Sequence, residues 1–257
     1  MYSNDDTMHQ DTSSFYTNIG DVYKEMGEYM EALEYHTKAL KIDTEIHGAS
    51  EHPRISRCYH GIGNAYFSLG KHTLALEYYT KSLEMYKVVY GVNTNHPSIA
   101  ESYSAFGKAY HSQGEYTLAL ECHSKSLEMY KAVYGADTNH TSIATSYRAI
   151  GDVYYRQGEY TLALEYFMKS LEMYKDVYGE NTDHPYIAIC YSTIGHTCNS
   201  QGEYTLALEY YTKSLEMKKV VYGADTNHPD IAVTYYAIGN IYDSQGEYTL
   251  ALEYYTK

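Results

Sequence analysis

Apolar and polar residues follow one another along this chain at spacings typical of α-helices. Ala100, Tyr103, Phe106 and Tyr110 recur three or four positions apart, and Pro97 stands just ahead of them. This spacing predicts an amphipathic helix. Proline is well suited to a first helical turn, because the N–H that it lacks would have no partner there. We therefore expect this helix, called helix A, to begin near Pro97.

A second helical pattern follows after a short break at Gln113-Gly114-Glu115. Gly114 can adopt the positive φ that often ends a helix. We expect Thr117 to cap the next helix, called helix B. The residues that share one face of helix B are Ala119, Cys122, His123, Ser126, Leu127 and Tyr130. A polar loop after Gly135 leads to the next helix A, so the unit is predicted to be a helical hairpin.

This hairpin pattern fills most of the chain. The phrase GEYTLALE begins at Gly114, Gly158, Gly202 and Gly246, which are 44 residues apart, and weaker copies begin at Gly27 and Gly70. A period of this length is typical of a stacked repeat array. We therefore predict an all-α fold, a right-handed superhelix of about six helical hairpins over residues 14–257. The predicted units are residues 14–52, 53–96, 97–140, 141–184, 185–228 and 229–257, the last one truncated, and residues 1–13 are predicted to be a disordered polar segment.

A glycine recurs inside every helix A. The six positions are Gly20, Gly63, Gly107, Gly151, Gly195 and Gly239. A glycine inside a helix is about 1 kcal/mol less favourable than an alanine. Its presence in all six units predicts a close contact between helices A and B that leaves no room for a side chain.

The repeated pattern resembles the tetratricopeptide repeat. The signature positions of that family are matched in the fourth unit by Tyr147, Ile150, Gly151, Tyr154, Gly158, Tyr160, Ala163, Phe167, Ser170 and Leu171. Each unit has some ten residues more than the usual 34, in a longer helix B and in a loop that ends in His-Pro. In this the chain is similar to the long repeats of kinesin light chains. The resemblance implies a protein-binding solenoid whose concave wall is lined mainly by the A helices.

Composition excludes several classes of function. Acidic residues outnumber basic ones by 33 to 19, which gives a net charge of −14. General nucleic-acid binding and adhesion to an anionic membrane both need a basic surface, so neither is expected. The chain has no apolar run long enough to span a bilayer, and its amino terminus does not resemble a signal peptide. Its four cysteines form no Cys-x-x-Cys pair, which favours a cytoplasmic protein.

No residue pattern predicts catalysis, a cofactor or a metal. The loop histidines recur at 44-residue spacing: His52, His96, His140, His184 and His228. Equivalent residues of stacked units lie too far apart to share one zinc ion, so we interpret these histidines as part of a helix-start motif whose ring packs on a neighbouring loop. The carboxylates Glu115 and Glu121 also recur in the other units, which is unusual for an active site. We therefore predict that the chain is not an enzyme.

The copies differ most in helix A. Helix B barely changes between units, whereas helix A varies. By the family register, the concave wall would contain Arg57, His60, Asn64, Lys108, His111, Arg148, Asp152, Tyr155, Arg156, His196, Asn199, Tyr236 and Asn240. The middle of this set, from Arg57 to Arg156, is basic and would suit an acidic extended segment. Drift at solvent-facing positions after duplication would produce the same variation, and both interpretations stay open.

These observations predict a protein–protein interaction scaffold or adaptor. An alternative is a regulatory or oligomerisation region of a larger protein whose catalytic domain lies outside this chain. The sequence stops at Tyr254-Tyr255-Thr256-Lys257, within the sixth helix B, and no capping helix follows. Repeat arrays generally need a polar cap. Two explanations are therefore open: the chain is a fragment, or its uncapped carboxyl-terminal end pairs with another copy.

Overall fold

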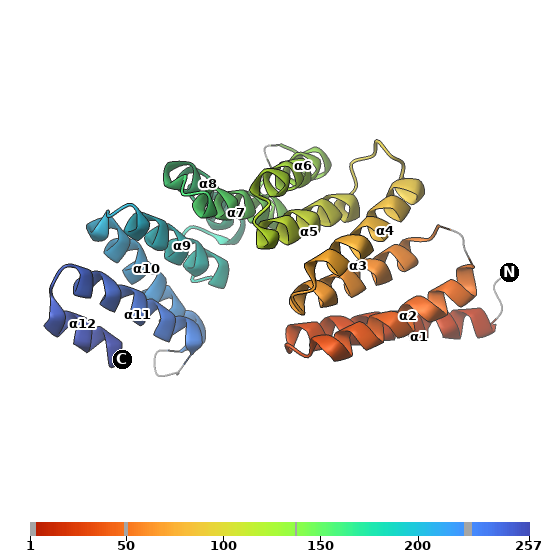
Figure 1. The fold of residues 1–257 in the computed structure, drawn as a ribbon, viewed down its shortest axis with the longest axis horizontal. Helices are drawn as coiled ribbons and strands as arrows, with labels where there is room; N and C mark the ends of the chain where they lie inside the picture. Colours follow the sequence, from red (N-terminus) through yellow and green to blue (C-terminus); the bar gives the residue numbers. More distant parts are fainter. Residues whose placement is uncertain (1–3, 49–50, 137, 224–227) are drawn as a thin grey trace. The chain divides into compact units, whose positions relative to one another are not determined.

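The computed structural model describes residues 4–48, 51–136, 138–223 and 228–257, with side chains from residue 11 onwards. Within these ranges the secondary structure is helical, without strands, and twelve α-helices form six hairpins (Figure 1). The all-α fold predicted from the sequence is confirmed. The helices are α1 Asn4–Glu25, α2 Tyr29–His47, α3 Pro53–Ser68, α4 His72–Tyr90, α5 Pro97–Gln113, α6 Tyr116–Tyr134, α7 Thr141–Arg156, α8 Tyr160–Tyr178, α9 Pro185–Ser200, α10 Tyr204–Tyr222, α11 Pro229–Ser244 and α12 Tyr248–Tyr255.

The chain forms two compact units, which we describe separately. Unit 1 (Met1–Gly135) contains α1–α6, and unit 2 (Ala136–Lys257) contains α7–α12. In each unit three hairpins follow one another, and the odd-numbered helices are the A helices. Helix B of one hairpin packs on helix A of the next: α2 on α3 and α4 on α5 in unit 1, and α8 on α9 and α10 on α11 in unit 2. A hairpin therefore buries its apolar faces partly against its neighbour.

The helix ends follow the predicted turn chemistry at two positions and depart from it at a third. Pro97 is the first residue of α5, and Gly114 has a φ of +81°. However, α6 begins at Tyr116 after Glu115, whose side chain makes no capping bond. The carbonyl of Glu115 already accepts the N–H of Ala119. The predicted cap at Thr117 is therefore wrong, because the tight glycine turn starts the helix before that residue.

The two ends of the array differ from the regular units. Helix α1 begins at Asn4, so residues 4–13 are helical. The prediction that they are disordered is wrong. This segment contains no glycine or proline. Once a helix has formed, each added residue gains one hydrogen bond. The part of α1 that packs on α2 can therefore extend towards the amino terminus through this segment. At the other end, α12 has 8 residues, whereas α10 has 19.

The recurring glycine of helix A lies against a ring of helix B. A Cβ atom on Gly107 would lie 2.5 Å from Cε1 of His123, and one on Gly151 would lie 2.6 Å from Cε1 of Phe167. Both rings are buried. The glycine and its ring are 16 residues apart in every hairpin. The predicted close contact between helices A and B is confirmed, and the ring fills the space that the glycine leaves.

A buried serine of helix B adds a polar link to the same contact. The hydroxyl of Ser126 donates a hydrogen bond to the carbonyl oxygen of Ala100 at 2.8 Å, and that of Ser170 donates to Ala144 at 2.8 Å. Ser82 and Ser214 make the equivalent bonds. A small hydroxyl residue thus lets the helices approach while its own polar group stays paired.

Candidate functional site

The predicted groove residues all lie on A helices and are exposed or partly exposed. Because the chain has two units, they form two sets. The set on unit 1 is Arg57, His60 and Asn64 on α3, with Lys108 and His111 on α5. The set on unit 2 is Arg148, Asp152, Tyr155 and Arg156 on α7, His196 and Asn199 on α9, and Tyr236 and Asn240 on α11.

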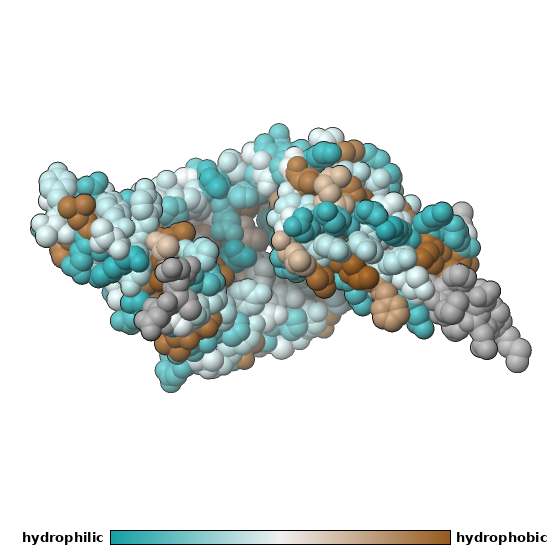
Figure 2. Space-filling view, turned by 90° about the horizontal axis from the view of Figure 1, so that it is seen from below, coloured by the Kyte–Doolittle hydropathy of each residue, from teal (hydrophilic) through white to brown (hydrophobic). Residues whose placement is uncertain are grey.

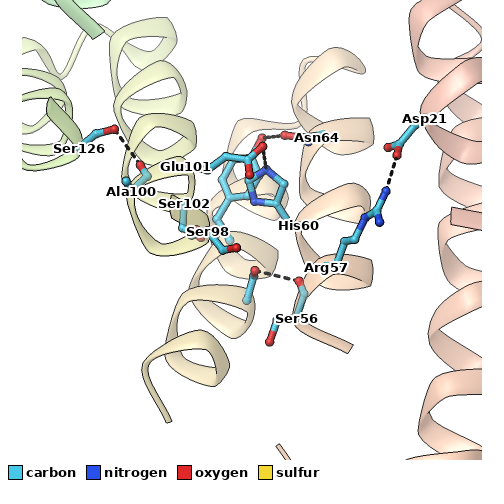
Figure 3. A network of polar contacts seen from close by, with 12 residues as sticks. Asp21, Ser56, Arg57, His60, Asn64, Ser98, Ala100, Glu101, Ser102 and Ser126 are labelled. Atoms are coloured by element: carbon cyan, nitrogen blue, oxygen red, sulfur yellow. Dashed lines mark hydrogen bonds and ion pairs between the residues drawn. The ribbon is translucent and has the colours of Figure 1, made fainter. Parts of the chain in front are cut away.

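The basic residue of α3 is paired with an acidic residue of α1. A guanidinium nitrogen of Arg57 lies 3.2 Å from Oδ2 of Asp21 (Figure 3). The same nitrogen lies 3.5 Å from Oδ1 of Asn18. Both charged side chains are about half exposed, so the pair is screened by solvent and adds little stability. Arg57 can therefore exchange Asp21 for a carboxylate of a ligand.

A second acidic residue lies beside His60. Nε2 of His60 is 3.7 Å from Oε1 of Glu101 on α5, and Figure 3 shows the two side chains together. Burial lowers the pKa of His60, which keeps the imidazole neutral near pH 7. The charge of Glu101 is therefore not cancelled by His60. Burial raises the pKa of Tyr86, and the charge of Glu101 raises it further.

Asp21 and Glu101 are not among the residues predicted for the groove. A comparison of repeat positions could have found them. Glu101 is 44 residues after Arg57, and Asp21 is 43 residues before Asn64, so both stand at positions already assigned to the wall. Their presence makes the A-helix face of unit 1 mixed in charge rather than uniformly basic.

Three of the predicted groove residues contact helix B of their own hairpin. The residue after the helix A glycine contacts the hydroxyl of the helix B tyrosine 15 positions later. Tyr79 donates to Oδ1 of Asn64 at 2.9 Å, and Tyr255 donates to Oδ1 of Asn240 at 2.7 Å. His196 lies 3.4 Å from the hydroxyl of Tyr211 through Nδ1. Part of the variation in helix A therefore follows the ring that helix B presents.

On unit 2, α7 places three charged side chains four residues apart. Arg148 lies 3.4 Å from Oδ2 of Asp152, and Arg156 follows one turn later. Burial raises the pKa of Asp152, and the two arginines oppose that rise. Among the described residues, Arg156 is exposed and forms no ion pair. Two cations thus flank one carboxylate, and the face of α7 carries an excess positive charge.

Aromatic and hydroxyl groups connect α7 to α9 beside these charges. The hydroxyl of Tyr155 is 2.9 Å from Nε2 of His196 and 2.9 Å from Oγ of Ser200. Burial, and then Arg156, lower the pKa of His196. On α11 the ring of Tyr236 is 61% exposed. The A-helix face of unit 2 therefore offers cationic, aromatic and hydrogen-bonding groups to a ligand.

The loop histidines cap the A helices. Nδ1 of His96 accepts the backbone N–H of Ser98 at 3.2 Å, and its ring stacks on Tyr90 at 3.6 Å. The four other loop histidines also accept the N–H two residues later. The helix-start interpretation is confirmed, although the His96 ring packs on the last residue of α4 rather than on a loop. Over the described ranges, no group of three or more potential metal-binding side chains occurs.

The cysteines lack the environment of reactive thiols. Burial raises the pKa of Cys58 to about 12 and that of Cys190 to about 11. Cys122 and Cys198 also have raised pKa values because of burial. A nucleophilic cysteine needs a thiolate, and these four stay protonated at neutral pH. None of the helices described here is long and apolar enough to cross a membrane.

Solved structures with similar folds support the repeat architecture. BtubC (BKLC) from P. vanneervenii has a TM-score of 0.68 at 16% identity, over 90% of this chain and 87% of its own. A putative kinesin light chain of Podosopora anserina with nearly identical TPR-like repeats has a TM-score of 0.66 at 18% identity, over 83% and 98%. The apo form of RapI has a TM-score of 0.64 at 17% identity, over 95% of both chains. Identities this low establish the fold alone.

Sequence models of the tetratricopeptide repeat match nearly the full length. One model matches residues 11–87 and 142–219, a second matches 99–141, and a third matches 232–257. No curated protein sequence matches the chain. The matched ranges, together with the glycine-to-ring contact in all six hairpins, show that the chain belongs to the tetratricopeptide repeat family.

Proposed function

We propose that this chain is a scaffold or adaptor that binds an acidic peptide segment on the A-helix face of unit 2. The observation that carries the proposal is the arrangement on α7, where exposed Arg156 follows the Arg148–Asp152 pair on one face. An arginine can hold a carboxylate with two parallel hydrogen bonds. Tyr155 and His196 lie beside it and offer rings for an aromatic residue of the same peptide.

Unit 1 offers a weaker version of the same chemistry. Arg57 and Lys108 lie on its A helices, but Arg57 already pairs with Asp21 and the carboxylate of Glu101 lies on the same face. An acidic ligand would have to displace Asp21 and would be repelled by Glu101. We therefore place the main acidic-peptide site on α7 and α9, and assign Arg57 a secondary contribution.

Binding of labelled peptides to the full chain tests this function. An array of extended peptides that vary in charge should favour Asp- and Glu-containing members, and Arg156→Glu should weaken the best binder by at least about tenfold, since it replaces an attraction by a repulsion. Arg156→Lys keeps the charge without the bidentate geometry and should lose less. Glu165→Gln on α8 is the matched control and should leave binding unchanged. Equal binding of acidic and neutral peptides would contradict the proposal.

Self-association is a second candidate, in line with an oligomerisation role. Val233 and Tyr236 on α11 and Leu252 on α12 are 64%, 61% and 64% exposed. Burying such side chains is worth roughly 1.5–3 kcal/mol each. Sedimentation velocity over a range of concentrations should then show a dimer that Leu252→Glu abolishes. A monomer at every concentration would rule this candidate out.

A further inference from the structure

Helix α1 carries an apolar stripe on the side opposite its own hairpin partner. Ser13 and Gly20 face α2, and both are buried. The stripe consists of Phe15, Ile19 and Val22 of α1 and of Met26, which directly follows the last residue of the helix, at spacings of four, three and four. These residues are 65%, 37%, 58% and 66% exposed. On the side of the molecule that Figure 2 shows, apolar residues lie among polar ones. Contiguous apolar groups of this kind mark an interaction surface.

The same repeat positions are buried on other A helices. The position of Phe15 is occupied by Cys58 on α3, which is 1% exposed, and that of Ile19 by Ile62, which is 2% exposed. On α9 the corresponding residues are Cys190 and Ile194, each 1% exposed. The stripe of α1 is thus an open copy of the surface by which one hairpin packs on another.

Direct contacts identify what covers these positions elsewhere. At the position of Phe15, Cys58 lies 3.5 Å from Oδ2 of Asp43 on α2, and Thr234 on α11 lies 2.9 Å from Nζ of Lys218 on α10. At the position of Ile19, the ring of Phe106 on α5 lies 5.9 Å from the ring of Tyr79 on α4. In each case the covering element is the helix B of the preceding hairpin.

We propose that the stripe of α1 binds an amphipathic α-helix of another polypeptide, seated as helix B of one hairpin sits on helix A of the next. The established contacts α2–α3, α4–α5 and α10–α11 define this mode of binding. The bound helix presents a small residue to Phe15, because Phe15 is larger than the Cys58 or Thr234 found at its position elsewhere. It presents aliphatic or aromatic side chains to Ile19 and Val22. This surface is separate from the acidic-peptide face of unit 2.

A helix B of this protein is the natural probe. We would use a labelled peptide of residues 70–91, which contains α4, with a lactam bridge joining Glu77 to Lys81. These two side chains are exposed and only 2.8 Å apart, so the bridge holds the helix without touching Tyr79. The peptide carries Tyr86→Ala, because Tyr86 stands at the repeat position of Asp43 and Lys218, which face the position of Phe15 elsewhere. Fluorescence anisotropy with the full chain should show saturable binding.

Two substitutions on the stripe and one outside it test where the peptide binds. Ile19→Glu and Val22→Glu should each weaken binding by at least about tenfold, because a carboxylate would be buried without a partner. Val88→Glu on α4 is the matched control, since Val88 is 60% exposed and lies outside the stripe. The Val88→Glu variant should bind the peptide with the same affinity as the unsubstituted chain. Circular dichroism of each variant checks that α1 remains folded.

Three outcomes would overturn the proposal. They are the absence of saturable binding by the bridged helix, an equal loss of binding in the Val88→Glu variant, and binding that survives both stripe substitutions. Sedimentation velocity without peptide distinguishes a further occupant. A dimer that Val22→Glu dissociates, combined with no peptide binding, would assign the stripe to a second copy of the chain instead.

Discussion

Substitution of Gly151 by alanine tests the contact on which every hairpin depends. The added Cβ would lie 2.6 Å and 2.7 Å from two ring atoms of Phe167, and 3.2 Å from the carbonyl oxygen of Ala163. Phe167 is 1% exposed, so its ring has no open space into which it can turn. The helices α7 and α8 must therefore move apart, or the ring must leave its rotamer.

The expected magnitude follows from two opposing effects. Overpacking a core in this way costs roughly 1–3 kcal/mol, while the better helix propensity of alanine offsets about 1 kcal/mol of that loss. Gly151→Ala should therefore lower the free energy of unfolding by roughly 0–2 kcal/mol. Gly151→Leu adds more atoms to the same filled space and should lower it further. Urea unfolding followed by far-ultraviolet circular dichroism measures both values.

A double-mutant cycle separates the contact from other effects of the substitution. In a Phe167→Ala background the ring is absent, so Gly151→Ala should become neutral or stabilising. Gly158→Ala is the matched control. Gly158 has a φ of +81° and no atom within 4 Å of its would-be Cβ, so its cost is one of backbone conformation and should be the same in both backgrounds. An equal effect of Gly151→Ala with and without the ring would contradict the steric explanation.

Three further predictions concern the helix contacts and caps. Burial lowers the pKa of His123 to about 3, so the folded protein favours the neutral ring. The contribution of this ring to stability is complete above the unfolded-state pKa of 6.5 and declines as the pH falls towards 3. His123→Phe, which copies Phe167, should reduce the loss of thermal stability between neutral and acidic pH, and an unchanged acid profile would contradict this. His96→Ala should lower the unfolding free energy by about 1 kcal/mol, whereas His96→Asn keeps a capping acceptor and should lose less; equal losses in urea titrations would exclude the capping role. Ser126→Ala removes the bond to the Ala100 carbonyl and should cost about 1 kcal/mol in the same titrations, and no measurable cost would show that the bond contributes nothing net.

The candidate site could be predicted only in part from the sequence. The register of the repeat correctly placed all thirteen residues on A helices. It did not show that Asn64 and Asn240 accept tyrosine hydroxyls, or that Arg57 pairs with Asp21. Partners such as these lie 15 to 36 residues away along the chain, and their distance depends on how helices pack. Residue type and spacing alone do not determine that packing.

The hairpin and its repetition could be read from the order of residues alone. Local rules were sufficient for this, because helical periodicity, the Gly114 turn and Pro97 each act within one or two turns of the chain. Which polar residues of the A helices face a partner inside the protein, and which face solvent, depends on how the helices pack. Packing also makes Ile19 partly exposed on α1 and Ile62, at the same repeat position, buried on α3. A side chain of helix A becomes buried only where the helix B of a neighbouring hairpin covers it, so the same residue pattern can have two different environments.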